Sequence, residues 1–179
     1  MAIYDDVAEC YDATRGGEQR GNDFATELHR RLPDGDGPVL EVGVGTGVIA
    51  LGLSSLDRTV IGVDVAPAML ARAQVRLGAG LVLGDARLLP IADASMAHAL
   101  SVWVVHAVDP PEALFAEVAR VLRPGGRYLV CPTNRIRGDD PIEPILDAMS
   151  TGPPASTPRG AGTQSALVTS PDGRLRPVS

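Results

Sequence analysis

Short apolar runs and longer stretches with helical spacing alternate along most of this chain. A run of apolar, often β-branched residues is typical of a buried parallel strand, whereas apolar residues at every third or fourth position are typical of a helix with one buried face. The runs predict strands at residues 39–42, 59–63, 81–83, 96–103 and 127–131. The helical spacing predicts helices within residues 24–32, 48–53, 67–77 and 112–122. This alternation indicates an α/β fold, with a doubly wound, mostly parallel sheet, right-handed crossovers and helices on both faces.

The first predicted strand runs directly into a glycine-rich turn, which reads LEVGVGTG from Leu40 to Gly47. Glycines allow a sharp turn and let a ligand approach the backbone N–H groups and the N-terminus of the next helix. The dinucleotide pattern GxGxxG would need a further glycine at position 48, where the chain has Val48. The acidic Glu41 would repel a pyrophosphate, but it suits a ligand that carries positive charge.

An acidic residue followed by GxGxG resembles the first motif of the class I S-adenosylmethionine-dependent methyltransferases, in particular the small-molecule type 11-like family. The residues that carry this match are Glu41, Gly43, Gly45 and Gly47. The resemblance implies S-adenosyl-L-methionine as the cofactor and these four residues as part of its site. It also implies a Rossmann-like sheet that closes with two further strands, the last of them antiparallel.

Two acidic residues follow in the order that this family shows. Asp64 ends the second predicted strand, roughly 20 residues after the glycine turn, where a carboxylate can bind both ribose hydroxyls. It could also cap the helix that follows. The segment VDVAPAMLARA resembles the family's second motif and adds Val65 to the cofactor contacts. At the end of the third strand, the resemblance implies that Asp85 binds the adenine amino group and that the N–H of Ala86 faces the ring, although an aspartate in a plain turn is the alternative.

The remaining candidates lie at the N-terminus and along the fourth strand. The fragment YDATRGG resembles the lid segment of small methyltransferases, in which Tyr11 and Arg15 would lie over the methionine end of the cofactor; a surface loop is an equal alternative. Ser101 is a further predicted cofactor contact. No catalytic residue is identified. His106 follows the fourth strand at the ligand-binding edge and is the candidate for a general base, although a lone histidine is more often structural.

Composition excludes several classes of function. A formal charge of −6 and an aromatic content of 3% argue against nucleic-acid binding. The two cysteines, Cys10 and Cys131, are too few for a disulfide framework and lack the spacing of a metal site. No apolar run is long enough to span a bilayer, and the N-terminus has no apolar leader. We therefore expect a cytoplasmic protein without a metal site, nucleic-acid partner or membrane partner.

The chain is predicted to divide into a cofactor-binding domain and a tail. Residues 1–150 form the predicted S-adenosylmethionine-binding domain, whose first 36 residues supply a lid and a helix. Residues 151–179 are rich in Pro, Gly and Ser and are expected to be mobile, because they bury too little apolar area to offset the entropy of ordering. Only 166–169 and 175–178 could supply the closing strands, so we expect these to be missing or incomplete. The edge beyond the fifth strand would then be open to self-association.

The residues together predict methyl transfer from S-adenosyl-L-methionine to a small-molecule acceptor by in-line displacement. In such a reaction the protein mainly positions and desolvates the reactants. Two alternatives stay open. One is a non-catalytic or partner-dependent cofactor-binding protein, indicated by the unusual C-terminus. The other is an NAD(P)-dependent oxidoreductase, which Val48 and Glu41 disfavour.

Overall fold

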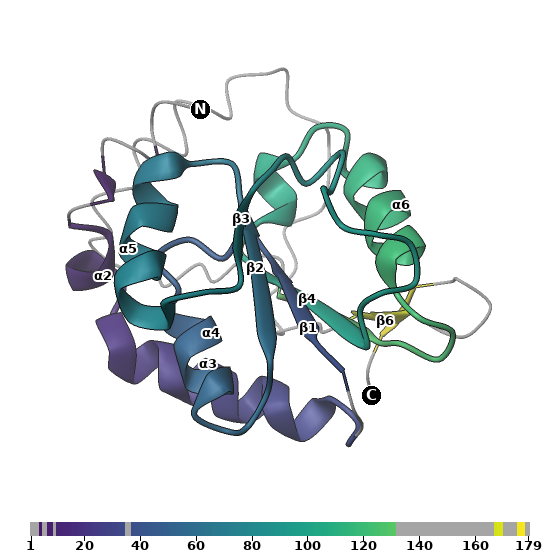
Figure 1. Cartoon of the computed structure of the whole chain (residues 1–179), viewed down its shortest axis with the longest axis horizontal. Helices are drawn as coiled ribbons and strands as arrows, with labels where there is room; N and C mark the ends of the chain where they lie inside the picture. Colours follow the sequence, from purple (N-terminus) through teal and green to yellow (C-terminus); the bar gives the residue numbers. More distant parts are fainter. Residues whose placement is uncertain are drawn as a thin grey trace, which may run out of the picture.

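The computed structural model describes residues 4, 7–8, 10–34, 37–131, 167–169 and 175–177, the last two ranges by their backbone only. Within these ranges, seven strands form one sheet in the order β3-β2-β1-β4-β5-β6-β7 (Figure 1). The strands are β1 (Val39–Val42), β2 (Val60–Asp64), β3 (Leu81–Leu83), β4 (His98–Val102), β5 (Tyr128–Cys131), β6 (Leu167–Thr169) and β7 (Leu175–Pro177).

The first five strands are parallel, as predicted. Val39 of β1 pairs with Val60 of β2 on one side and with His98 of β4 on the other, so these strands start level with one another. Their carboxyl ends therefore meet at one edge of the sheet. The strand order reverses between β1 and β4, which is the point where open α/β sheets bind ligands.

Helices cover both faces of the sheet. In Figure 1, α3, α4 and α5 lie on one side of the strands and α6 lies on the other. The short α2 precedes α3, and a 3₁₀ turn, η1, follows β4. Their bounds are α2 (Tyr11–Thr14), α3 (Gly17–Arg31), α4 (Val48–Ser54), α5 (Pro67–Leu77), η1 (Val105–Ala107) and α6 (Pro111–Val121). None of the described helices is long and apolar enough to cross a membrane.

Each face of the sheet carries its own apolar core. Successive residues of a strand point to opposite faces, so Val39 packs in the cluster that includes α3 and α4, whereas Leu40 packs in the cluster that includes α6. On the α6 side, Leu114, Val118 and Val121 are all fully or almost fully buried. Burial on both faces explains why the strands read as continuous apolar runs in the sequence.

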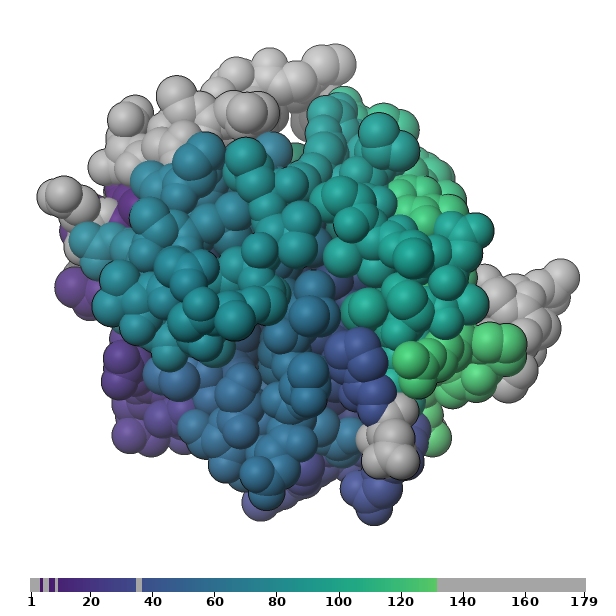
Figure 2. Space-filling view, in the orientation of Figure 1, coloured from purple at the N-terminus to yellow at the C-terminus, as the bar shows by residue number. Residues whose placement is uncertain are grey.

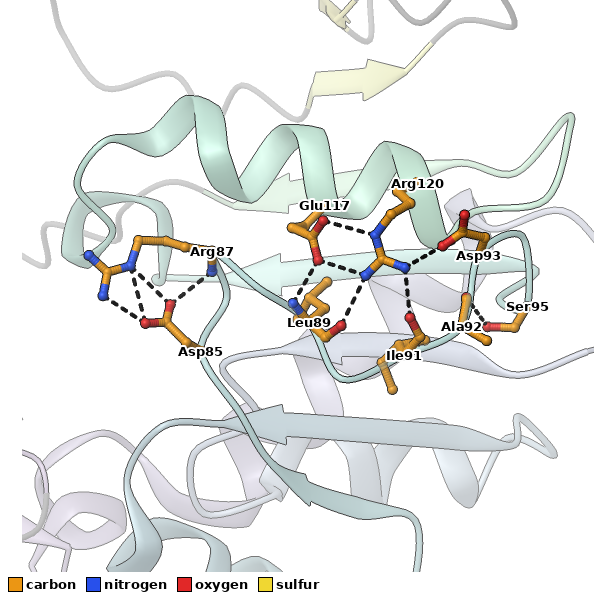
Figure 3. Close-up of polar contacts among 9 residues, drawn as sticks. All are labelled: Asp85, Arg87, Leu89, Ile91, Ala92, Asp93, Ser95, Glu117 and Arg120. Atoms are coloured by element: carbon orange, nitrogen blue, oxygen red, sulfur yellow. Dashed lines mark hydrogen bonds and ion pairs between the residues drawn. The ribbon is translucent and has the colours of Figure 1, made fainter.

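An arginine on α6 holds the irregular segment between β3 and β4. Arg120 forms ion pairs with Glu117 and Asp93, both at 2.6 Å, and donates hydrogen bonds to the carbonyls of Leu89 and Ile91 (Figure 3). Glu117 in turn accepts a hydrogen bond from the N–H of Leu89 at 2.7 Å. The segment forms no regular strand or helix here, and these side-chain bonds satisfy backbone groups that secondary structure would otherwise pair.

The end of the sheet has two short closing strands, in line with the expectation that these strands are incomplete. β6 pairs with β5 through Val130 and Leu167, and β7 pairs with β6, so both closing strands are present with three residues each. β6 is antiparallel to β5, and the last strand, β7, is antiparallel to β6 at the edge of the sheet. Self-association through an exposed sheet edge stays a prediction. The rest of the 151–179 tail lies outside the described residues, so its mobility stays a prediction.

Candidate functional site

A cavity of about 430 Å³ opens where the carboxyl ends of β1, β2 and β4 meet. This volume is in the range of sites for small ligands and cofactors. The glycine turn and the end of β2 form one wall, and the segment from Val102 to Asp109 forms the opposite wall. Tyr4 and Tyr11 of the N-terminal segment also line the cavity. The cavity therefore lies at the reversal of strand order, where the topology favours a ligand site.

The three glycines of the turn have positive φ angles, but each meets a different neighbourhood. Gly45 lines the cavity, has a φ of +54° and would place a Cβ in open space. Gly43 also lines the cavity, but a Cβ there would overlap the Val104 side chain. Gly47 caps α4 with a φ of +80° and packs against Ala73 of α5, away from the cavity wall. Gly47 thus has a packing role in this structure, and its predicted contact with the cofactor stays a prediction.

Asp64 joins the end of β2 to the glycine turn. Its Oδ2 accepts a hydrogen bond from the N–H of Gly45 at 2.8 Å, and its Oδ1 accepts one from the N–H of Ala66 at 2.9 Å. Ala66, not Asp64, is the N-cap of α5, and it makes no side-chain cap bond, so the capping alternative is not found. Asp64 and Val65 both line the cavity. Because each carboxylate oxygen has a second lone pair, Asp64 can still accept hydrogen bonds from a ligand.

Glu41 lies beneath the turn instead of in the cavity wall. Its side chain is 2% exposed, and burial, aided by the negative charge of Asp64, raises its pKa to about 8. The N–H of Ala50, in the first turn of α4, donates a hydrogen bond to the carboxyl group. Glu41 is therefore largely protonated at neutral pH. Its place in the motif supports the turn from below, and a contact between Glu41 and the cofactor stays a prediction.

Asp85 and Ala86 form the rim of the cavity after β3, together with Arg87. Asp85 is held by Arg87, whose backbone N–H donates to Oδ1 at 2.8 Å and whose Nη2 lies 2.7 Å from Oδ2 (Figure 3). Hydrogen bonding to Arg87 lowers the pKa of Asp85. Arg87 also donates to the carbonyl of Asp109 at 3.3 Å and so links the two walls. Sequence reasoning missed Arg87, although an arginine two residues after an acid is a detectable pairing signal.

The wall after β4 is mainly apolar and centres on Trp103. This residue has a φ of +60°, and its ring meets Phe24 edge-on at 5.1 Å between centroids. The guanidinium of Arg20 lies 4.4 Å from the centroid of the Trp103 ring on another side. Val104 and Val108 continue the wall. The 3₁₀ turn leaves His106 exposed to solvent, and His106 does not line the cavity.

Ser101 does not line the cavity. It lies within β4, is 0% exposed, and its Oγ lies 2.7 Å from the Oη of Tyr128. Burial raises the pKa of Tyr128 to about 12, and the Ser101 bond opposes this shift. Ser101 therefore satisfies a buried hydroxyl in the core, and its contact with the cofactor stays a prediction.

The described part of the N-terminal segment contributes tyrosine side chains to the cavity. Tyr11 lines the cavity, and burial raises the pKa of both Tyr4 and Tyr11. The guanidinium of Arg15 lies 5.5 Å from the centroid of the Tyr11 ring and borders a small hollow beside the cavity. The hollow also touches Arg20 and Trp103.

The structure brings seven of the twelve predicted site residues together around the cavity. The predicted residues that line the cavity are Tyr11, Gly43, Gly45, Asp64, Val65, Asp85 and Ala86. Those that do not line it are Arg15, Glu41, Gly47, Ser101 and His106. Among the described residues, no group of three or more His, Cys, Asp or Glu side chains could hold a metal ion.

Known proteins resemble this chain both in sequence and in fold. A family model described as "Methyltransferase domain" matches residues 40–130. Demethylmenaquinone methyltransferase of Mycobacterium sp. (strain KMS) is 35% identical over 142 residues, which cover 75% of this chain and 61% of that protein. This chain therefore spans less than two thirds of the length of that relative.

Two solved structures show the same fold. One is a chain from the complex between the Haloferax volcanii Trm112 methyltransferase activator and a methyltransferase, with 27% identity, a TM-score of 0.62, and coverage of 72% of this chain and 59% of that chain. The other is the glycopeptide N-methyltransferase MtfA in complex with S-adenosyl-L-methionine. It has 26% identity, a TM-score of 0.55, and coverage of 62% of this chain and 53% of its own.

Proposed function

Since this chain belongs to the methyltransferase-domain family, we propose that it transfers a methyl group from S-adenosyl-L-methionine to a small-molecule acceptor. The observation that carries the proposal is the cavity wall made by Gly45 and Asp64. A Cβ at Gly45 would point into open space on the cavity side, so the turn leaves room for a ligand close to the backbone. That space fits a cofactor that lies along the carboxyl ends of the strands.

Several residues would hold the cofactor. Asp64 would accept hydrogen bonds from the ribose hydroxyls, and Asp85 with the N–H of Ala86 would bind the adenine edge. Tyr11 would cover the methionine end. Glu41, neutral and buried, would act through the glycine turn, which it supports from below. Arg15 borders the neighbouring hollow, from which its charge would favour the methionine carboxylate.

The bound cofactor would supply a methyl group on a positively charged sulfur, which leaves as a neutral thioether. The acceptor's nucleophilic atom would donate its electron pair to the methyl carbon from the side opposite the sulfur. A neutral oxygen or nitrogen acceptor would also release a proton. Trp103, Val104 and Val108 would exclude water from the reacting atoms and orient the acceptor for in-line attack.

A strong general base is not part of this proposal. Burial raises the pKa of Tyr4 and Tyr11, so both hydroxyls stay protonated near neutral pH and would orient ligands by hydrogen bonding. His106 is not assigned the role of general base, because it does not line the cavity. Positioning and desolvation would then supply most of the rate, with the acceptor's proton passing to solvent.

Dependence on a partner is the second candidate, in which this chain binds the cofactor but needs another protein for turnover. The solved Haloferax volcanii complex, in which a methyltransferase is bound to an activator protein, supports this candidate. An NAD(P)-dependent oxidoreductase is less well supported, because Val48 stands at the third glycine position of the dinucleotide pattern.

Calorimetric titration tests the cofactor first. We expect S-adenosylhomocysteine and S-adenosylmethionine to bind with a 1:1 stoichiometry and NAD⁺ and NADP⁺ to give no heat. Binding of the nucleotides alone would overturn the proposal. Release of S-adenosylhomocysteine would then be followed with a panel of acceptors, starting with quinols because of the demethylmenaquinone methyltransferase relatives. Binding without turnover on the whole panel would favour the partner-dependent candidate.

A further inference from the structure

A partly buried polar triangle joins the N-terminal segment to the glycine turn. The carboxylate of Asp12, on α2, accepts a hydrogen bond from the Thr46 hydroxyl at 2.5 Å. Its other oxygen lies 2.5 Å from Nη2 of Arg76, on α5. The third side of the triangle is a hydrogen bond of 2.9 Å from Nη1 of Arg76 to the carbonyl of Thr46. Three segments that are far apart in the sequence are thus tied at one point beside the cavity.

The triangle is partly shielded from water, which distinguishes it from an ion pair between fully exposed side chains. The side chains of Arg76 and Asp12 are only 19% and 18% exposed, and Thr46 is 2% exposed. Exposed ion pairs contribute little because solvent screens them, whereas charge-assisted hydrogen bonds in partly buried sites are stronger. Glu18 of α3 adds a second carboxylate 3.5 Å from Nε of Arg76. Arg76 therefore links α2 and α3 to α5 through ion pairs with Asp12 and Glu18.

The segment held by this triangle is the one that covers the cavity. Figure 1 draws α2 beside α5, and the purple N-terminal atoms lie against the same region in Figure 2. Ala8 packs with Ala66 and Met69 at the start of α5, next to Tyr4 and Tyr11. This apolar cluster is small, so it would order the segment only in part.

We propose that Arg76 is a positioning residue that latches α2 onto the glycine turn and thereby holds Tyr11 over the bound cofactor. The inference rests on the proposed function, because the latch matters only if a cofactor occupies the cavity. Arg76 does not line the cavity, so it acts through Asp12 and Thr46. Opening the latch would free α2 to move away, which opens the path by which the cofactor leaves.

The test compares Arg76→Gln with Arg72→Gln, which removes the same charge from the same helix without touching Asp12 or Thr46. Trp103 is the only tryptophan of the chain and lines the cavity, so its fluorescence reports S-adenosylhomocysteine in stopped-flow displacement. We expect Arg76→Gln to raise the dissociation rate about 10-fold, as for loss of one charge-assisted bond. Arg72→Gln should leave this rate unchanged, and Arg76→Lys should restore part of it.

A double variant checks that Arg76 acts through Asp12. Asp12→Asn combined with Arg76→Gln should dissociate no faster than the more affected single variant, because both break the same latch. Rates that multiply would overturn the latch. So would a fall in the melting temperature of Arg76→Gln with an unchanged dissociation rate, because that result assigns Arg76 a purely structural role.

Hydrogen exchange separates failure of the latch from failure of the proposed function. In the protein without ligand, Arg76→Gln should speed exchange of the amides at residues 10–16 and leave α6 unchanged. If the wild type binds no S-adenosylhomocysteine, the proposed function fails. The latch is then judged by exchange alone: faster exchange at 10–16 supports it, and unchanged exchange overturns it.

Discussion

The two walls of the cavity are built in different ways. On the glycine-turn side, backbone groups of Gly43 and Gly45 face the cavity and Asp64 fixes the turn through the N–H of Gly45. On the β4 side, the surface is made by side chains such as Trp103 and Val104. Where the backbone faces a ligand only glycine fits, so the glycines make this wall recognisable in the sequence. Where side chains form the wall many apolar residues would serve, so the sequence shows neither its shape nor the acceptor.

The walls also differ in how a substitution would act. A change on the glycine side alters the backbone or its hydrogen bonds, and binding and folding can be affected together. A change on the β4 side alters packing and the shape available to the acceptor. The difference between the two walls is therefore tested best by variants in which cofactor affinity and folding stability are measured separately.

The largest effect is expected from Gly45→Val. The branched side chain would fill the cavity where the structure leaves open space, so affinity for S-adenosylhomocysteine should fall at least about 100-fold. The fold should survive at a cost of about 1–2 kcal/mol, since the φ of +54° strains an L residue. Calorimetry measures the affinity, and circular dichroism shows whether the fold is kept. Gly43→Ala is the contrasting control and should lower the melting temperature more, because its Cβ would overlap Val104. An unfolded Gly45→Val would make this glycine structural.

Asp64→Ala should weaken cofactor binding by about 1.5–3 kcal/mol, the range for hydrogen bonds to a charged group. It should also lower stability, because the N–H groups of Gly45 and Ala66 lose their acceptor. Asp64→Asn keeps one acceptor oxygen, so its cofactor affinity and its stability should both lie between those of the wild type and Asp64→Ala. Calorimetry and urea unfolding measure them. Unchanged affinity in Asp64→Ala would refute the ribose assignment.

Glu41→Gln should change the dependence of stability on pH. The folded pKa of Glu41 is raised to about 8, well above its unfolded value of about 4.3, so the folded state binds more protons between these values. Stability should be highest below the unfolded pKa and fall as pH rises toward 8, by up to about 1.4 kcal/mol per pH unit. Glutamine does not titrate, so the variant should lose this slope. Urea unfolding across this range measures it, and parallel profiles would contradict the prediction.

Ser101→Ala should have the smallest effect and should affect stability alone. The Tyr128 hydroxyl would lose its partner in the core, which costs about 1–3 kcal/mol. Affinity for S-adenosylhomocysteine should stay at the wild-type value, because Ser101 lies outside the cavity wall. A weaker affinity with normal stability would return Ser101 to the cofactor site.

The sequence was sufficient for elements that depend on local pattern. Helix α5 and strand β3 agree with their predicted bounds residue for residue, since proline and glycine mark their ends. Strand β4 is shorter than the predicted 96–103, because Met96 bridges to Leu122 and Trp103 adopts a positive φ. The site was predictable where glycine or an acid ends a strand.

The remainder of the site depends on partners that are distant in the sequence. Ser101 and Tyr128 are 27 positions apart, and Asp12 and Arg76 are 64 positions apart. Periodicity and motif spacing carry no information about such pairs. Gly47 was similarly taken as a ligand contact because it shares the motif, whereas its neighbour Ala73 belongs to the next helix.

The double use of Asp64 bears on how such a chain would change over evolutionary time. Its carboxylate already joins β2 to the glycine turn before any cofactor enters. A descendant that had abandoned catalysis would still be under selection to keep this aspartate, because losing it would loosen the fold. A side chain at Gly45 would strain the positive φ but displace no packed group, since nothing beyond its chain neighbours lies within 4 Å of the Cβ that it lacks. In a comparison of related chains, replacement at Gly45, not at Asp64, should therefore be the mark of a lineage that no longer binds the cofactor.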